Sequence, residues 1–317
     1  MTDNTSMGSA FALATGQDDE TNLDAVAAYY FGQPMGKTEP LEMDAPIEVQ
    51  RITKMGQYYS SLNIGNNPMD KWTVSSKITN GLPLFWMFGK ATHTTPNTKQ
   101  TITNFTNTEG RKPRIKLWSR DGDNTKMAYG ACVSNLIWRF DEKGISQIYS
   151  GKACKHETVA YASNTPSAIT HPGTKPAMFD RFDSLKWNNN SIPNMKFVEF
   201  KAAQELLTTL HETGGYYSDL DESTPIDIDV NIGFTANDVN LLADYDAKTK
   251  RTIVWKMLKP DGSGDYFEIT LANSYCYLMT KLIARGEILG YTAHFTCENV
   301  SGVVQDTIAD TFYTIPT

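Results

Sequence analysis

Apolar and polar residues alternate along several short segments of this chain, which is the pattern of half-buried β-strands. In the clearest segment, residues 226–234, the apolar positions are Ile226, Ile228, Val230, Ile232 and Phe234, and the positions between them are Asp227, Asp229, Asn231 and Gly233. Successive side chains of a strand point to opposite faces of its sheet. The segment therefore predicts a strand with one buried face and one wet face, and Asp227 and Asp229 lie on the wet face.

Two longer segments, residues 114–154 and 252–297, share one order of strands and turns. Each has an apolar run, an Asp-Gly pair (Asp121-Gly122 and Asp261-Gly262), a strand, a basic residue before Gly (Lys143-Gly144 and Arg285-Gly286) and a closing strand. An Asp-Gly pair between strands is a strong signal of a hairpin turn. The pattern predicts two antiparallel meanders, and we treat 110–155 and 250–298 as a possible internal repeat.

Helices are expected at few places. The second half of residues 195–215 has helix-favouring residues and a Gly214-Gly215 stop, so we expect a helix near 200–212. A short helix is also expected over 237–245. The compact apolar segment 81–91 fits either a buried helix or a strand.

The expected fold class is mainly β, an antiparallel sandwich or barrel with a short flanking helix and long loops. We divide the chain into an N-terminal arm (1–45), a β-sandwich domain (46–300) and a C-terminal tail (301–317).

Composition narrows the possible functions. The 317 residues are 40% hydrophobic and 21% charged, which is typical of a globular protein, and the net charge is −7. No basic patch of the kind that a sequence-specific DNA-binding protein needs is evident. The sequence has no secretory signal pattern and no apolar run of about 18 residues, so no membrane partner is expected. The four cysteines lack CxxC spacing and are interpreted as buried thiols.

The sequence shows no catalytic motif. The five histidines have no metal-site spacing, and the nucleotide-binding and hydrolase motifs are missing. We therefore predict no catalytic residue, no cofactor and no metal. The acidic residues around Asp227 and Asp229 have three interpretations: a solvated face, a carboxylate pair for glycoside hydrolysis, or acids that line a pore and let a polyanion slide. The third makes Asp227 and Asp229 candidate lumen-facing acids.

One ordered set of motifs resembles a known family. The segment 129–136 (YGACVSNL) is a strand of the Gly-x-Cys-x-x-Asn-Leu type, followed by a turn at 142–145 (EKGI) and a strand ending at 151–153 (GKA). Upstream stand GLPL (81–84), Phe88-Gly89 and THT (92–94), and downstream stand 228–243 and LANS (271–274). Over roughly residues 45–300, this order is similar to the tail tube proteins (major tail proteins) of long-tailed phages and related tailed viruses.

The resemblance implies a virion structural protein, made in the host cytoplasm, that polymerises into stacked rings. Its partners would be copies of itself, other tail proteins, and viral DNA that passes through the lumen without sequence-specific binding. It implies no catalysis. If each half of the chain were a complete module, three chains would form a pseudo-sixfold ring. Six chains are favoured here, because residues 1–110 have no evident counterpart before the second meander.

Two alternatives stay open at this point. The chain could be another tail component of similar fold, such as a terminator or a baseplate hub protein. It could also be a carbohydrate-binding β-sandwich protein or a glycosidase.

Overall fold

The computed structural model describes most of the chain. The described residues are 11–15, 28–30, 41–44, 49–52, 61–64, 71–95, 99–104, 112–121, 124–160, 178–192, 194–210, 217–221, 224–235, 239–284, 287–306 and 313. In these residues the chain is mainly β and antiparallel with two short helices, which confirms the predicted fold class.

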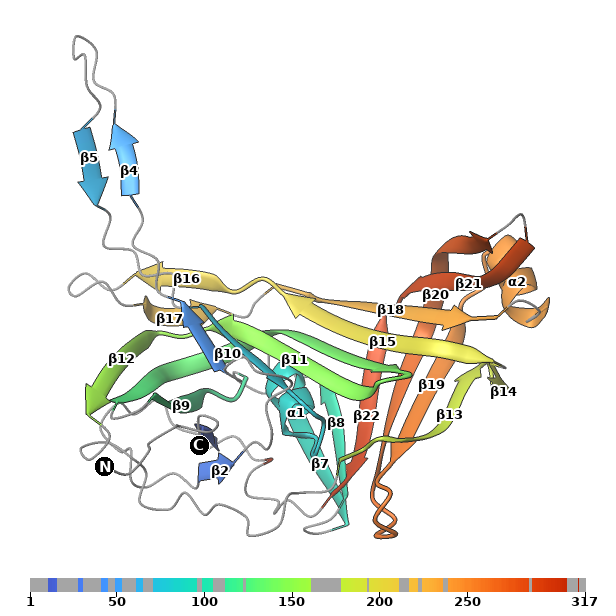
Figure 1. Ribbon diagram of the computed structural model, residues 1–317, viewed down its shortest axis with the longest axis horizontal. Coiled ribbons are helices and arrows are strands. Elements are labelled where there is room, and N and C mark those ends of the chain that lie inside the picture. Colours follow the sequence, from blue (N-terminus) through green and yellow to red (C-terminus); the bar gives the residue numbers. More distant parts are fainter. Residues whose placement is uncertain are drawn as a thin grey trace.

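One long antiparallel sheet runs along the top of the molecule in Figure 1. Its strand order is β3–β6–β11–β10–β15–β18–β21–β20. In that order the strands span Leu41–Asp44, Lys71–Ser76, Gly144–Lys152, Asn124–Asp141, Met195–Gln204, Ile226–Phe234, Glu287–Thr296 and Tyr266–Ala284. Only the second halves of β10 and β20 belong to this sheet.

The first halves of β10 and β20 belong to two further sheets. The first half of β10 pairs with β9 (Ile115–Asp121) and β12 (Lys155–Ala160). The first half of β20 pairs with β19 (Arg251–Leu258) and β22 (Asn299–Gln305). The sheet of β9 continues through β1 (Phe11–Thr15) to β2 (Ala28–Tyr30). The sheet of β20 continues through β13 (Arg181–Trp187) to β14 (Asn190–Ser191) on one side, and through β8 (Lys99–Asn104) to β7 (Gly89–Thr95) on the other.

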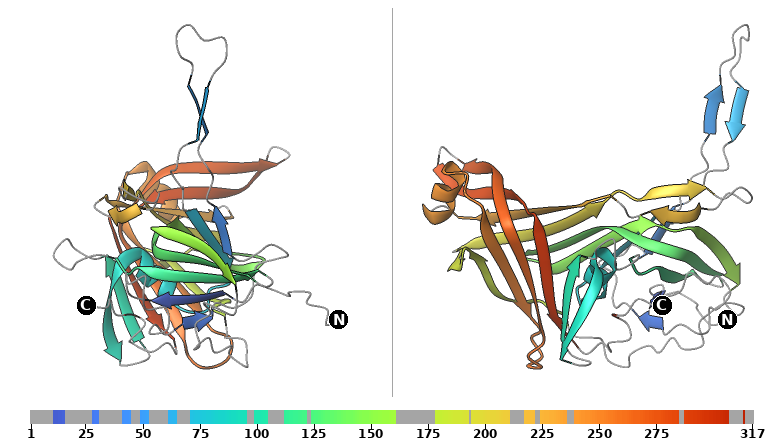
Figure 2. Two further views of the ribbon diagram at one scale, coloured as in Figure 1. Left: turned by 90° about the vertical axis from the view of Figure 1, so that its left-hand side faces the viewer. Right: turned by 180° about the vertical axis from the view of Figure 1, so that it is seen from behind.

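Two separate hairpins project from the sheets. β4 (Val49–Ile52) pairs with β5 (Ser61–Ile64), and this hairpin stands away from the rest of the molecule in both figures (Figures 1 and 2). β16 (Leu207–Leu210) pairs with β17 (Tyr217–Asp221) close to one end of the long sheet.

Residues 81–91, for which the sequence fits either a buried helix or a strand, form a helix, α1 (Leu82–Phe88), and then the start of strand β7 (Gly89–Thr95). Pro83 stands in the first turn, where its missing N–H costs nothing, and Gly89 ends the helix at φ 84°. Oδ2 of Asp306 and the hydroxyl oxygen of Tyr313 both accept the N–H of Gly81 at 3.1 Å, so these two residues are tied to the start of the helix. All seven helical residues are buried, which explains a helix that is apolar on every side.

The core lies between the inner face of the long sheet and the two further sheets. Trp72, Trp86, Trp138, Trp187 and Trp255 are all at most 1% exposed, and Trp138 and Trp255 both pack on Phe267 at centroid distances near 5 Å (4.9 and 5.2 Å). These five tryptophans therefore pack in the core, as aromatic residues of a sandwich do.

The two halves of the chain share one topology. The elements β3, β4–β5, β6, α1, β9, β10, β11 and β12 correspond in order and pairing to β15, β16–β17, β18, α2, β19, β20, β21 and β22. α2 (Val239–Asp246) is the helix expected near 237–245. The expectation that residues 1–110 have no counterpart is therefore wrong, because β3, β6 and α1 match β15, β18 and α2.

The helix expected near 200–212 is also wrong. Residues 200–204 belong to strand β15 and residues 207–210 form strand β16, while 211–212 lie outside the described residues. Ala, Gln and Glu favour helices, but Val198, Phe200 and Ala202 are buried at every second position, and β15 is paired on both sides, with β10 and β18. The two ladders of hydrogen bonds and the burial outweigh the small differences in propensity.

The predicted domain boundaries remain predictions. Three described strands of the 1–45 segment (β1, β2 and β3) pair with strands of the larger sheets. Of the 301–317 segment, β22 covers the first residues and Tyr313 is buried, while 307–312 and 314–317 lie outside the described residues.

Candidate functional site

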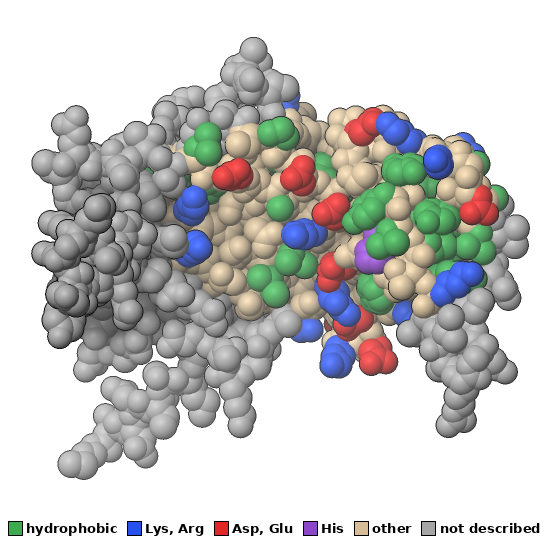
Figure 3. Space-filling view, turned by 90° about the horizontal axis from the view of Figure 1, so that it is seen from above, with side chains coloured by type: hydrophobic (Ala, Val, Ile, Leu, Met, Phe, Trp, Pro, Cys, Tyr) green, Lys and Arg blue, Asp and Glu red, His purple; other side chains and the backbone are tan. Residues whose placement is uncertain are grey.

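The face of the long sheet that points away from the core is the candidate functional surface, and we call it the outer face. Figure 3 views it from above. The alternation predicted for residues 226–234 is confirmed: Ile228, Val230 and Ile232 are buried, whereas Asp227 is exposed and Asp229 is partly exposed. Both acids therefore lie on the outer face of β18.

A chain of polar contacts crosses four neighbouring strands on the outer face. Arg139 of β10 donates to Glu199 of β15 (Nη1 to Oε2, 3.3 Å), and Asn231 of β18 donates to the other oxygen of Glu199 (3.0 Å). His294 of β21 lies 2.7 Å from the side-chain oxygen of Asn231. Since Asn231 uses its NH₂ group for Glu199, its oxygen accepts, and Nδ1 of His294 carries the proton. The network fixes these strands in register on their solvent side.

The charge of the outer face is mixed rather than uniformly acidic. Arg139 also donates from Nε to Asp141 (3.1 Å), so its cation lies between two carboxylates. Lys201 lies directly opposite Asp229 in the β15–β18 pairing. Asp227 lies opposite Ala203, which brings no charge. Acidic and basic side chains accordingly appear interspersed on this surface (Figure 3). The carboxylates beside Arg139 and opposite Lys201 weaken the attraction of these two cations for a polyanion.

The second half of β20 forms one edge of this sheet and exposes apolar side chains there. In the described part of the chain it pairs only with β21, on one side. Tyr277 is 49% exposed and Leu278 is 46% exposed. The ring of Tyr277 lies 6.3 Å from that of His294. The pKa of Tyr277 is raised, first by partial burial and then by the negative charge of Asp229. The edge therefore joins an apolar strip to the polar network.

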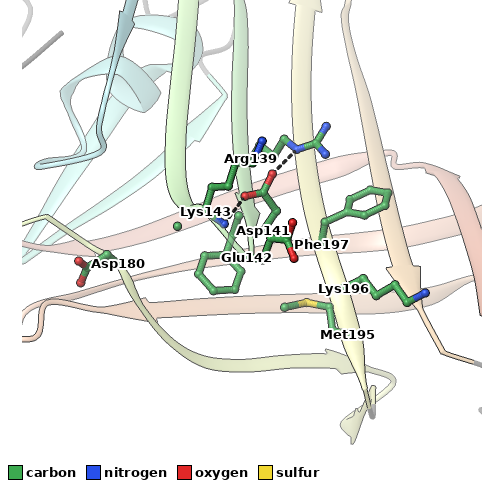
Figure 4. Close-up of a pocket in the computed structure, with 10 residues that line it drawn as sticks. Arg139, Asp141, Glu142, Lys143, Asp180, Met195, Lys196 and Phe197 are labelled. Carbon is green, nitrogen blue, oxygen red and sulfur yellow. Dashed lines mark hydrogen bonds and ion pairs between the residues drawn. The ribbon is translucent and has the colours of Figure 1, made fainter. Parts of the chain in front are cut away.

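An open groove of about 930 Å³ lies beside the middle strands of the long sheet, where the β10–β11 turn meets the start of β15 (Figure 4). It is lined by Arg139, Phe140, Asp141, Glu142, Lys143, Gly144, Asp180, Met195, Lys196 and Phe197. The carboxylate of Asp141 accepts the backbone N–H of Lys143 (2.8 Å), and Arg139 lies over the ring of Phe197 at 5.1 Å. Asp141, one of the three acids that line the groove, is thus engaged in the turn and in an ion pair with Arg139.

The groove does not contain the predicted acids. Asp227 and Asp229 are absent from its lining and stand two positions apart on one strand of an open surface. A glycosidase needs two carboxyl groups that flank a bound sugar. The placement of Asp227 and Asp229 gives no support to that interpretation.

Three of the four cysteines are buried, and Cys154 is partly exposed. Cys276 and Cys297 are buried, and burial raises the pKa of each thiol to about 11. Within the described ranges, no three His, Cys, Asp or Glu side chains gather as metal ligands would. No helix in the described part is long and apolar enough to span a membrane.

Sequence reasoning placed Asp227 and Asp229 on a wet face but did not find the network beside them. Arg139 was visible as the polar position in an apolar alternation, and His294 stands in a similar position in its strand. Glu199 was hidden because its segment was expected to be partly helical. The signal that identifies the network is the pairing of β10, β15, β18 and β21 as neighbouring strands, which places these four side chains next to one another.

Comparison with known proteins gives no relative from which to transfer a function. No protein-family model matches the chain, and no curated protein matches it. Among solved structures, the crystal structure of a Pseudomonas aeruginosa FadL homologue aligns with 94% of this chain and 88% of its own at 9% identity, with a TM-score of 0.10. A score of that size carries no information on fold or function.

Proposed function

We propose that this chain is a tail tube protein, a structural component of a virion that assembles with copies of itself into stacked rings around a hollow lumen. Viral DNA would pass through the lumen without sequence-specific binding, and other tail proteins would cap the tube. The chain acts as a building unit and not as an enzyme.

The observation that carries the proposal is the long sheet with two open edges. In the described part of the chain, β3 pairs only with β6, and the second half of β20 pairs only with β21. Unpaired edges present rows of free N–H and C=O groups that template pairing with another chain. A protein that works as a free monomer blunts such edges, whereas a ring of copies satisfies them by pairing one with the next.

The outer face supports the assignment of the lumen. It carries polar side chains, its Arg139 and Lys201 have carboxylates as neighbours, and Asp227 lies opposite an alanine. Such a surface offers DNA phosphates little attraction, so DNA moves along it without sticking. The projecting β4–β5 hairpin is suited to reach a neighbouring ring (Figure 2).

Electron microscopy of the purified protein tests the proposal. Negative-stain images over a range of protein concentrations should show rings at low concentration and tubes with a central channel at higher concentration. The alternatives give different results. A terminator or hub protein would form single rings that never stack, and a carbohydrate-binding protein would stay a small particle that binds a glycan array. Either result contradicts the tube assignment.

A further inference from the structure

The long sheet consists of two four-stranded units side by side. The first unit has the order β3–β6–β11–β10, and the second has the order β15–β18–β21–β20. In each unit, the strand that comes first in the sequence (β3 or β15) lies at one edge of the unit. The strand that comes third in the sequence (β10 or β20) lies at the other edge. The units meet where β10 pairs antiparallel with β15, from Asn135 opposite Ala203 to Phe140 opposite Val198.

Two irregularities fix the correspondence between the units residue by residue. β10 has a first bulge at Gly130 (φ 55°) and a second at Ser134. β20 has a first bulge at Asn273 (φ 53°) and a second at Tyr277. The spacing between the two bulges is the same in both strands, so Ser134 corresponds to Tyr277. A bulge bends a strand. In both β10 and β20, the first bulge marks the point where the long strand passes from one sheet into another.

This correspondence shows what is missing at the open edges. β20 is the equivalent of β10, and its unpaired side is the side on which β10 pairs with β15. In the same way, β3 is the equivalent of β15, and its unpaired side is the side on which β15 pairs with β10. Leu278 corresponds to Asn135, which is only partly exposed opposite Ala203, whereas Leu278 itself is 46% exposed. The edge of β20 therefore resembles the β10 side of the β10–β15 junction with the partner strand absent.

We propose that β20 of one copy pairs antiparallel with β3 of the next copy, in the register by which β10 pairs with β15 inside the chain. This inference rests on the proposed function and names the contact that closes the ring. The occupant of the edge is a second copy of this chain, because β3 is the strand equivalent to β15. The contact is head-to-tail, which builds closed rings when the rotation between copies closes.

The register follows from the aligned ladders. Thr280 corresponds to Ile137, and Asp44 corresponds to Lys201, because Asp44 pairs with Lys71 as Lys201 pairs with Asp229. Ile137 lies opposite Lys201 in the β10–β15 pairing. Thr280 of one copy should therefore lie opposite Asp44 of the next. Since each chain supplies two units, a ring of six units would contain three chains and show pseudo-sixfold symmetry.

Disulfide cross-linking of the assembled protein tests this pairing. Residues directly opposite each other in an antiparallel pair have Cα atoms about 4.5–5.5 Å apart, which a disulfide can bridge. The variant T280C/D44C should form intermolecular disulfides in rings under mild oxidation, ending at a closed trimer on a non-reducing gel. The native thiols of Cys276 and Cys297 interfere little, because their pKa values of about 11 keep them protonated.

Three controls accompany the variant. I137C/K201C carries the same pairing within one chain and should give an intramolecular disulfide without change in chain mass. T280C/L41C moves the partner three positions along β3, roughly 10 Å, and should cross-link at least tenfold more slowly. The unmodified chain should give no disulfide-linked species. Native mass spectrometry of the rings should find three chains of 35.3 kDa each.

The outcomes separate this inference from the proposed function. Rings that form without the T280C/D44C link would overturn the pairing, and rings of six chains would overturn the pseudo-sixfold arrangement of three chains. Either result leaves the tube assignment in place. Cross-linking that is faster in T280C/L41C would overturn the register. A chain that forms neither rings nor tubes at any concentration would overturn the tube assignment, and the inference would fall with it.

Discussion

At the scale of single residues, the outer face combines a fixed polar network with a pair of acids whose surroundings differ. Arg139, Glu199, Asn231 and His294 are joined by hydrogen bonds. Asp229 lies opposite Lys201, whereas Asp227 is exposed and lies opposite an alanine. If this face lines the lumen, the network keeps the surface rigid, and the acids keep DNA from binding it.

Reversal of the two acids tests that role. The variant D227K/D229K places two more cations on the outer face, and DNA phosphates should then bind it. We expect tubes of normal appearance and an ejection rate at least several-fold slower, with the slowing relieved by added salt because screening weakens surface charges. Reconstituted virions and single-particle ejection assays measure this.

The matched control is D183K/D246K, which makes the same change in net charge on exposed residues of β13 and α2, two elements that are not strands of the long sheet. It should eject at the normal rate. Equal ejection rates in both variants and the unmodified virion would remove Asp227 and Asp229 from the lumen.

At the scale of elements, one carboxylate of α2 joins the helix to its sheet by three hydrogen bonds. Asp244 accepts hydrogen bonds from Trp187 of β13 (2.7 Å) and from two nitrogens of Arg251 of β19 (3.2 and 3.1 Å). Burial alone would raise the pKa of Asp244, but the hydrogen bonds and the charge of Arg251 outweigh it and lower the pKa below 3.8. The stabilisation is therefore present above about pH 4 and is lost as the pH falls through the lowered pKa of the folded state.

The variant D244N should lose about 1–2 kcal/mol of stability at pH 7, because the acceptor loses its charge and part of its hydrogen bonding. The loss should shrink as the pH falls below 3.8, where the native carboxylate is progressively protonated as well. Urea unfolding at a series of pH values measures both effects. D246N, on the same helix and exposed, should stay within about 0.5 kcal/mol of the unmodified protein. A penalty for D244N that does not change with pH would contradict the assignment.

Local pattern predicted some elements well and missed others for physical reasons. The strand at 226–234 and the hairpin at Asp261-Gly262 were visible because alternation and turn residues are local signals. β15 was missed because its Ala, Gln and Glu residues favour a helix, and only its two neighbouring strands decide the matter. The network on the outer face joins four strands that are far apart in the sequence, so no local signal marks it.

At the scale of the whole molecule, the chain is a tandem pair of equivalent units. The meanders were recognisable in the sequence because their turns are alike. β3 and β15 share only a short alternation, Leu41-Glu42-Met43 and Val198-Glu199-Phe200, so their equivalence emerges from the pairing. The intact junction between β10 and β15 is then a model for the contact between copies. The proposed self-assembly would account for the two sheet edges that lack a partner strand within the described residues, and for the exposed apolar strip at Tyr277 and Leu278.

Amide hydrogen exchange along the second half of β20 measures the central claim most directly. The amides of Tyr275–Lys281 that point away from β21 have no strand partner within the described chain. They should exchange rapidly in dilute protein and become strongly protected once the concentration is raised and rings form, while the buried strand β18 stays protected throughout. Equal exchange at both concentrations, together with sedimentation as a single chain, would contradict the account.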